Sequence, residues 1–199
     1  MIIGIDFETT GLDTDTLDIV EIAIVLYTDG LSVYDTYTQV FRLSVDKIDA
    51  CNDVVKQMHT ENGLWDEVLE SSVHPEDIKD DLAALFDEWS KHGNLKKAPL
   101  MGNSVHFDRA ILKRFFPEIH DRVSHRNIDV SSFNELAKRW DPIAVPRAVM
   151  THRALDDVKE SARTLKEYRK TWLNTAISVR LQDLKSRITT TVRGLFGAR

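Results

Sequence analysis

One stretch limits the possible folds more than any other: residues 19–27 are nearly all apolar. A strand of this kind must be covered on both faces, which is typical of a central strand in a layered α/β protein. Residues 2–8 alternate instead. They predict a strand with one apolar face and a second face that carries Gly4, Asp6 and Glu8.

The rest of the chain predicts a mixed sheet with helices around it. Asp29-Gly30 is a hairpin turn signal, so residues 31–43 should form a third strand antiparallel to the second. Short strands are expected at 98–102 and 127–130, helical portions within 52–65, and helices at 75–89, 104–116, 131–140 and 154–168. Strands followed by alternating helices and strands indicate an α/β fold with five strands.

Composition indicates the environment and class of the chain. It has 199 residues, enough for one domain with an appendage. The single cysteine, Cys51, excludes an internal disulfide framework and a cysteine-based zinc site. No apolar run approaches the roughly 20 residues that cross a bilayer, and the N-terminus does not read as a signal peptide. We therefore expect a cytoplasmic protein without a membrane partner.

Charge divides the chain into two parts. Residues 171–199 hold five basic residues and one acid, whereas residues 1–170 hold 21 basic and 31 acidic residues. The expected domains are a body at 1–170 and a basic amphipathic helical tail at 171–199. The tail has a heptad-like apolar seam. It predicts a terminal helix packed on the body, with a self-association helix or a basic arm for nucleic acid as the alternatives.

Three groups of polar residues in the body point to metal chemistry. Asp6 and Glu8 share one side of the first strand, where two like charges repel unless a cation lies between them. Asp108 falls on the apolar stripe of the helix at 104–116, and a buried carboxylate needs a cation or hydrogen bonds. The alternatives are solvated acids at a strand end and, for Asp108, a helix-capping role or a salt bridge with Arg109 or Arg114.

The third group is His152 with Asp156 and Asp157. If His152 is helical, it pairs with Asp156 one turn later, but if it lies on a loop, either acid could face the site. Carboxylates without sulfur ligands favour two divalent ions, Mg²⁺ or Mn²⁺, that together activate a water and stabilise a displacement at phosphorus. His152 is the candidate general base for that water.

The polar groups resemble the signature of the DEDDh 3′→5′ exonucleases, which have a ribonuclease H-like fold. Within them the chain is most similar to the oligoribonucleases. The likeness runs in order through residues 6–12 (DFETTGL), 59–64 (HTENGL), 102–104 (GNS), 126–131 (RNIDVS) with 135–140 (ELAKRW), and 151–158 (THRALDDV). It implies four ligands for two divalent ions, Asp6, Glu8, Asp108 and Asp157, with His152 as general base. It also implies a homodimer.

The resemblance extends in part to a pocket for short substrates. Leu12 matches an apolar wedge, and Ser104, Arg126 and Ser131 match residues that cap a 5′-phosphate. His59 and His125 are further substrate-binding candidates. Two positions depart from the family: Val54 stands where a base-stacking tryptophan is usual, and His125 where a tyrosine is contributed across the dimer. Loss of an aromatic side chain could relax the length preference.

The sequence therefore predicts a metal-dependent 3′→5′ exoribonuclease that degrades short single-stranded RNA to nucleoside 5′-monophosphates. The acidic body agrees with short substrates, because few phosphates need to be neutralised by side chains. A DNA-directed exonuclease of the proofreading or repair type is the main alternative. A binding module without catalysis is the other, and the presence of all four acids and His152 argues against it.

Overall fold

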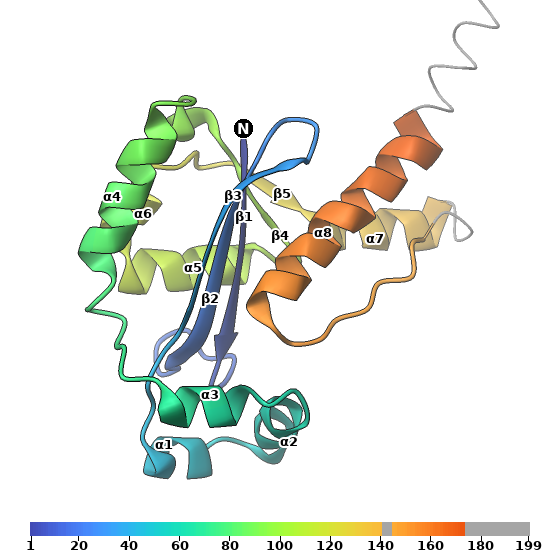
Figure 1. Cartoon of the computed structure of the whole chain (residues 1–199). Helices are drawn as coiled ribbons and strands as arrows, with labels where there is room; N and C mark the ends of the chain where they lie inside the picture. The colour runs from blue at the N-terminus through green and yellow to red at the C-terminus, as the bar shows by residue number, and fades with distance from the viewer. Residues whose placement is uncertain (141–144, 174–199) are drawn as a thin grey trace, which may run out of the picture.

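The computed structural model describes residues 1–140 and 145–173. Its centre is a five-stranded sheet in the order β3-β2-β1-β4-β5 (Figure 1). The strands are β1 (Ile2–Thr9), β2 (Ile19–Tyr27), β3 (Val33–Val40), β4 (Leu100–Gly102) and β5 (Asn127–Asp129). The first three are antiparallel neighbours, whereas β4 and β5 run parallel to β1. The predicted mixed sheet is confirmed.

The two faces of the sheet carry different helices. Strand β2 is buried at every position, as its apolar sequence predicts. One face packs against α4 (Lys79–Ser90), α5 (His106–Phe115) and α6 (Pro117–His120), which appear together on one side in Figure 1. The other face packs against α7 (Val130–Trp140) and α8 (Ala154–Tyr168). The helix predicted at 154–168 is confirmed at both ends.

Helix α8 lies very close to the sheet at Gly4. A Cβ atom at this position would come within 2.6 Å of Val158 Cγ1 on α8 and 2.8 Å of the Tyr27 ring. Real Cβ atoms do not approach other heavy atoms so closely, so only glycine allows this packing. The alternating pattern of β1 thus serves two purposes: it buries Ile3 and Ile5 on one face and admits the helix on the other.

A small helical layer covers the end of β1. It consists of α1 (Val45–Asp49), α2 (Asp53–Glu61) and α3 (Leu64–Glu70), and the carboxyl end of β1 points towards it (Figure 1). Its own core contains Val20 of β2 together with Leu64, Trp65 and Val68 of α3. This layer brings α2 and α3 to the sheet edge that carries Asp6 and Glu8.

Several element boundaries differ from the sequence prediction. Strand β3 is shorter than the expected 31–43, because Leu31 has a left-handed φ of 64° and belongs to the turn. Pro117 does not simply end a helix; it begins α6, where its missing N–H costs nothing. Helix α4 begins at Lys79 rather than at Pro75. Helix α1 was not predicted, since five residues show too little periodicity.

The predicted tail lies almost entirely outside the described residues. After α8 the chain continues as a short π-helical segment, Arg169–Leu173, and the heptad-like seam of 174–199 is not described. The division into domains at 1–170 and 171–199 therefore stays a prediction. Within the described ranges, no helix is both long and apolar enough to span a membrane.

Candidate active site

Asp6 and Glu8 lie on β1 and face the side of the sheet that α8 covers. The alternation of the strand separates them from Ile5 and Phe7, which enter the core on the other face. Glu8 is buried and Asp6 is half-buried. Both therefore stand near the carboxyl end of β1, as the sequence predicted, and this end of the strand lies next to α2 and α3.

Asp108 reaches the same strand from α5. Its side chain is buried, and its Oδ1 accepts a hydrogen bond of 3.0 Å from the Phe7 backbone N–H, between Asp6 and Glu8 along the strand. Neither neighbouring arginine pairs with it: Arg109 binds Asn127 and two carbonyls, and Arg114 binds carbonyls of the loop before β2. The salt-bridge alternative for Asp108 is therefore wrong.

Helix α8 supplies Asp157 and not Asp156. Asp157 is buried, and its Oδ1 accepts a 3.0 Å hydrogen bond from the Thr151 N–H, whereas Asp156 is exposed in the same first turn. His152 precedes the helix on a loop and has a left-handed φ of 56°. Spacing alone left open whether Asp156 or Asp157 faces the site. Because His152 is not helical, the pairing with Asp156 one turn later does not apply, and the buried acid is Asp157.

The four carboxylates repel one another in a poorly solvated site. Burial raises the pKa of Asp6 well above its usual value, and the charges of Asp108, Glu8 and Asp157 raise it further. Burial, followed by the charge of Asp157, raises the pKa of Glu8 to about 8. The pKa of Asp108 rises to about 7, again chiefly through burial. Such a cluster gains stability from bound cations.

His152 lies beside two of these acids. One ligand atom each from Glu8, His152 and Asp157 lie within 4.8 Å of one another, so the three could hold a metal ion together. His152 is exposed and its imidazole is open to solvent. The same geometry therefore allows His152 either to bind a cation or to accept a proton beside one.

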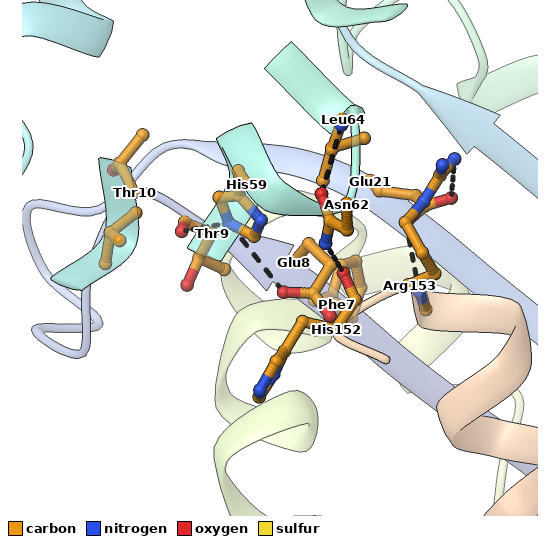
Figure 2. A network of polar contacts seen from close by, with 12 residues as sticks. Phe7, Glu8, Thr9, Thr10, Glu21, His59, Asn62, Leu64, His152 and Arg153 are labelled. Carbon is orange, nitrogen blue, oxygen red and sulfur yellow. Dashed lines mark hydrogen bonds and ion pairs between the residues drawn. The ribbon is translucent and has the colours of Figure 1, made fainter. Parts of the chain in front are cut away.

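The loop of His152 is anchored by residues that the sequence analysis missed. Arg153 pairs with Glu21 of β2 at 3.1 Å (Figure 2). It also pairs with Glu67 of α3 at 2.7 Å, and the Glu21 carboxylate accepts the Ala154 N–H at 2.9 Å. Together these contacts join β2, α3 and the start of α8. A single acid within the apolar stretch 19–27 was the available signal, since a buried carboxylate requires partners.

His59 is enclosed behind Glu8. It has no exposed surface, its Nε2 lies 3.8 Å from Glu8 Oε2 and 3.5 Å from the Thr9 carbonyl oxygen, and its ring meets Trp65 edge-on. Burial lowers the pKa of His59 to about 4, so the ring is neutral. This placement does not match the predicted direct contact with substrate: the buried ring lies beside the carboxylate group of Glu8 instead.

The predicted phosphate-binding residues lie around β5: Ser104 between β4 and α5, Arg126 just before β5, and Ser131 in the first turn of α7. The Ser104 backbone N–H donates to Ser131 Oγ at 2.9 Å and to Asp129 Oδ1 at 3.1 Å, and Ser104 has a left-handed φ of 50°. Arg126 and His125 are both exposed on the turn before β5. Among the described residues, the Arg126 side chain forms no ion pair.

Exposed apolar side chains lie on the loop after β1 and on α2. Leu12 is 85% exposed on the loop after β1. A groove of about 570 Å³ runs beside His152, with Val54 and Met58 of α2 on one wall and Met150 on the other. Val54 is 74% exposed, and it stands where the family resemblance places an aromatic residue. The groove therefore has an aliphatic side chain at this position of α2.

Fold and site together describe a nuclease-like carboxylate centre at the end of a mixed sheet. Residues 3–165 match the exonuclease family, and the chain belongs to that family. It is similar to the oligoribonuclease of Corynebacterium diphtheriae, with 34% identity over 177 residues that cover 86% of this chain and 83% of the relative. It is also 37% identical to the oligoribonuclease of Rhodococcus jostii, over 85% of this chain and 86% of that protein.

Solved structures share the fold at low sequence identity. Pop2p of S. pombe, solved with Mg²⁺ and Mn²⁺ bound, matches with a TM-score of 0.65 and 16% identity over 86% of this chain and 84% of that one. E. coli exonuclease I in complex with a dA16 oligonucleotide matches with a TM-score of 0.64 and 13% identity. This chain spans about two fifths of exonuclease I. The predicted ribonuclease H-like exonuclease fold is thereby confirmed.

Proposed function

We propose that the protein is a metal-dependent 3′→5′ exoribonuclease that releases nucleoside 5′-monophosphates from short single-stranded RNA. The observation that carries this proposal is the convergence of Asp6, Glu8, Asp108 and Asp157 from three separate elements at one edge of the sheet. The match to oligoribonucleases over most of both chains supports the preference for short RNA.

The donor set suits hard divalent cations. All four acids offer oxygen, and no sulfur ligand lies among them, which favours Mg²⁺ or Mn²⁺. Their mutual repulsion, seen in the raised pKa values of Asp6 and Glu8, is the cost that bound cations would relieve. We therefore assign these four residues as ligands of two such ions. When bound, the ions supply Lewis acidity and lower the pKa of an attacking water.

His152 is the residue we assign as general base. The attacking water forms a new bond to phosphorus, and the bond from phosphorus to the 3′-oxygen of the preceding nucleotide breaks, so that the terminal nucleotide leaves with its 5′-phosphate. The proton lost by the water passes to the His152 imidazole, which is exposed beside Glu8 and Asp157. The preceding nucleotide takes a proton on its freed oxygen.

The residues around β5 support a preference for short substrates. The exposed Arg126 guanidinium can bind a terminal phosphate by two hydrogen bonds, and the paired hydroxyls of Ser104 and Ser131 can add further hydrogen bonds. A phosphate held there would limit the number of nucleotides between the two ends. We propose that Leu12 and the wall at Val54 separate and support the bases in between.

The decisive experiment is a product time course on end-labelled RNA and DNA of two to twenty nucleotides. We expect monophosphate products, activity only with Mg²⁺ or Mn²⁺, loss with a chelator, and the fastest turnover on the shortest RNA. Asp108→Ala and His152→Ala should each remove most activity without unfolding the protein. Normal turnover by either variant would contradict the assigned roles, and a uniform preference for DNA would favour the proofreading-type alternative.

Three expectations remain predictions. A homodimer and a cytoplasmic location follow from the resemblance and the composition, and the role of residues 171–199 is not described by the structure. Truncation after Lys170 followed by measurement of the mass in solution tests the tail. If the oligomeric state does not change, the tail is not a dimerisation element.

A further inference from the structure

Asn62 connects the α2–α3 junction to the loop that carries His152. Its Oδ1 accepts the Leu64 N–H at 3.0 Å at the start of α3, and its Nδ2 donates to the carbonyl oxygen of His152 at 2.5 Å and to that of Thr151 at 3.3 Å (Figure 2). One half of the amide therefore caps a helix, while the other half holds two successive carbonyls of a distant loop.

The held loop has an unfavourable backbone conformation. His152 has a φ of 56°, a region that L-residues avoid because Cβ meets the neighbouring carbonyl oxygen. Such a conformation persists only where the surroundings fix it. Among the described residues, the N–H side of the loop is held by Asp157, through the Thr151 N–H, and the carbonyl side by Asn62.

We propose that Asn62 is a positioning residue that keeps His152 in its left-handed conformation beside Glu8 and Asp157. This inference rests on the proposed function, because it assumes that His152 takes the proton in the reaction. Asn62 itself does not touch the reacting atoms. It acts through the His152 backbone, which sets the direction in which the imidazole leaves the loop.

The expected size of the effect follows from the backbone strain. The left-handed conformation costs an L-residue roughly 1–2 kcal/mol, which corresponds to about a 5- to 30-fold change in the population of the competent loop. Without the Nδ2 donor, kcat should fall by about that factor. KM should change little, because the interaction lost is with the loop and not with the substrate.

Two substitutions of Asn62 distinguish the role of its Oδ1 acceptor from that of its Nδ2 donor. Asn62→Asp keeps an oxygen to cap α3 but loses the donor to His152. Asn62→Ala loses both and adds no charge. Asn52→Asp is the matched control, since Asn52 caps α2 through its Oδ1 on the Val55 N–H, and its Nδ2 donates no hydrogen bond to the described residues.

Two measurements test the proposal on the full chain. The first is kcat and KM on a ribodinucleotide with Mg²⁺, together with the melting temperature. The second is hydrogen exchange of the Thr151 amide in chelator-treated protein, which reports loop order without activity. We expect both Asn62 variants to lose about 5- to 30-fold in kcat and to lose Thr151 protection. Asn62→Asp and Asn52→Asp should melt close to the wild type.

The outcomes distinguish a failure of the proposed function from a failure of the positioning role of Asn62. If the wild type has no metal-dependent exonuclease activity, the proposed function fails. The exchange result then still reports whether Asn62 orders the loop of His152. If the wild type is active and Asn62→Asp keeps its kcat and its Thr151 protection, the positioning role is refuted. A loss in Asn62→Asp but not in Asn62→Ala would assign the effect to the added charge and would also overturn the proposal.

Discussion

Replacing Asp108 with asparagine should stabilise the metal-free protein while it removes the activity. Asparagine keeps an oxygen that can accept the Phe7 N–H, and it keeps the shape of the side chain. What it removes is a negative charge in a buried position beside Asp6. The free energy of unfolding should therefore rise by an amount that depends on pH.

The magnitude follows from the shift in the pKa of Asp108. Burial raises this pKa from 3.8 to about 7. Because the folded protein binds the proton more tightly than the unfolded chain, stability is lost as the pH rises from about 4 to 7. At about 1.4 kcal/mol per pKa unit, the penalty is about 4 kcal/mol at pH 8 and about 1–2 kcal/mol at pH 5.

Urea unfolding at pH 5 and pH 8, with a chelator present, measures this difference. We expect Asp108→Asn to be more stable than the wild type by about 2–4 kcal/mol at pH 8, and by less at pH 5. Asp156→Asn is the matched control, because Asp156 is exposed on α8 and should change stability little at either pH. A gain that is equal at both pH values, or a loss at pH 8, would refute the electrostatic reasoning.

Other predictions follow from the same contacts. Asp157→Ala should reduce turnover far more than Asp156→Ala, and the reverse ranking would show that the wrong acid is assigned. Arg153→Met should lower the free energy of unfolding by about 2–4 kcal/mol, because it leaves Glu21 buried without its cation; urea unfolding measures this. The raised pKa of Glu8, about 8, means that protons compete with metal, so the Mg²⁺ concentration for half-maximal activity should fall from pH 6 to pH 8.5.

Much of the fold could be predicted because local and global signals agree. The apolar stretch 19–27 has no stable place except a central strand, and the alternation of 2–8 allows only one buried face. Asp108 was recognisable as a site residue for the same reason, since an acid on an apolar stripe is an exception that needs a partner. These patterns involve residues that are close together in the sequence, so they can be recognised without the structure.

The rest depends on contacts between distant segments. The left-handed conformation of His152 is imposed by Asn62, 90 residues away in sequence, and by Asp157. The pairing of Glu21 with Arg153 spans 132 residues, so no local pattern announces it. The burial of His59 arises in the same way, because α2 and α3 close over Glu8 only in the folded protein.

The absence of a side chain at Gly4 has a consequence at the far end of the strand. Helix α8 carries Val158 directly after Asp157, so the depth at which Val158 settles also sets the gap between Asp157 and the acids of β1. Even one methyl group at position 4 would push α8 away from the sheet. The distance between Asp157 and the acids of β1 therefore depends on Gly4, a residue without a reactive side chain.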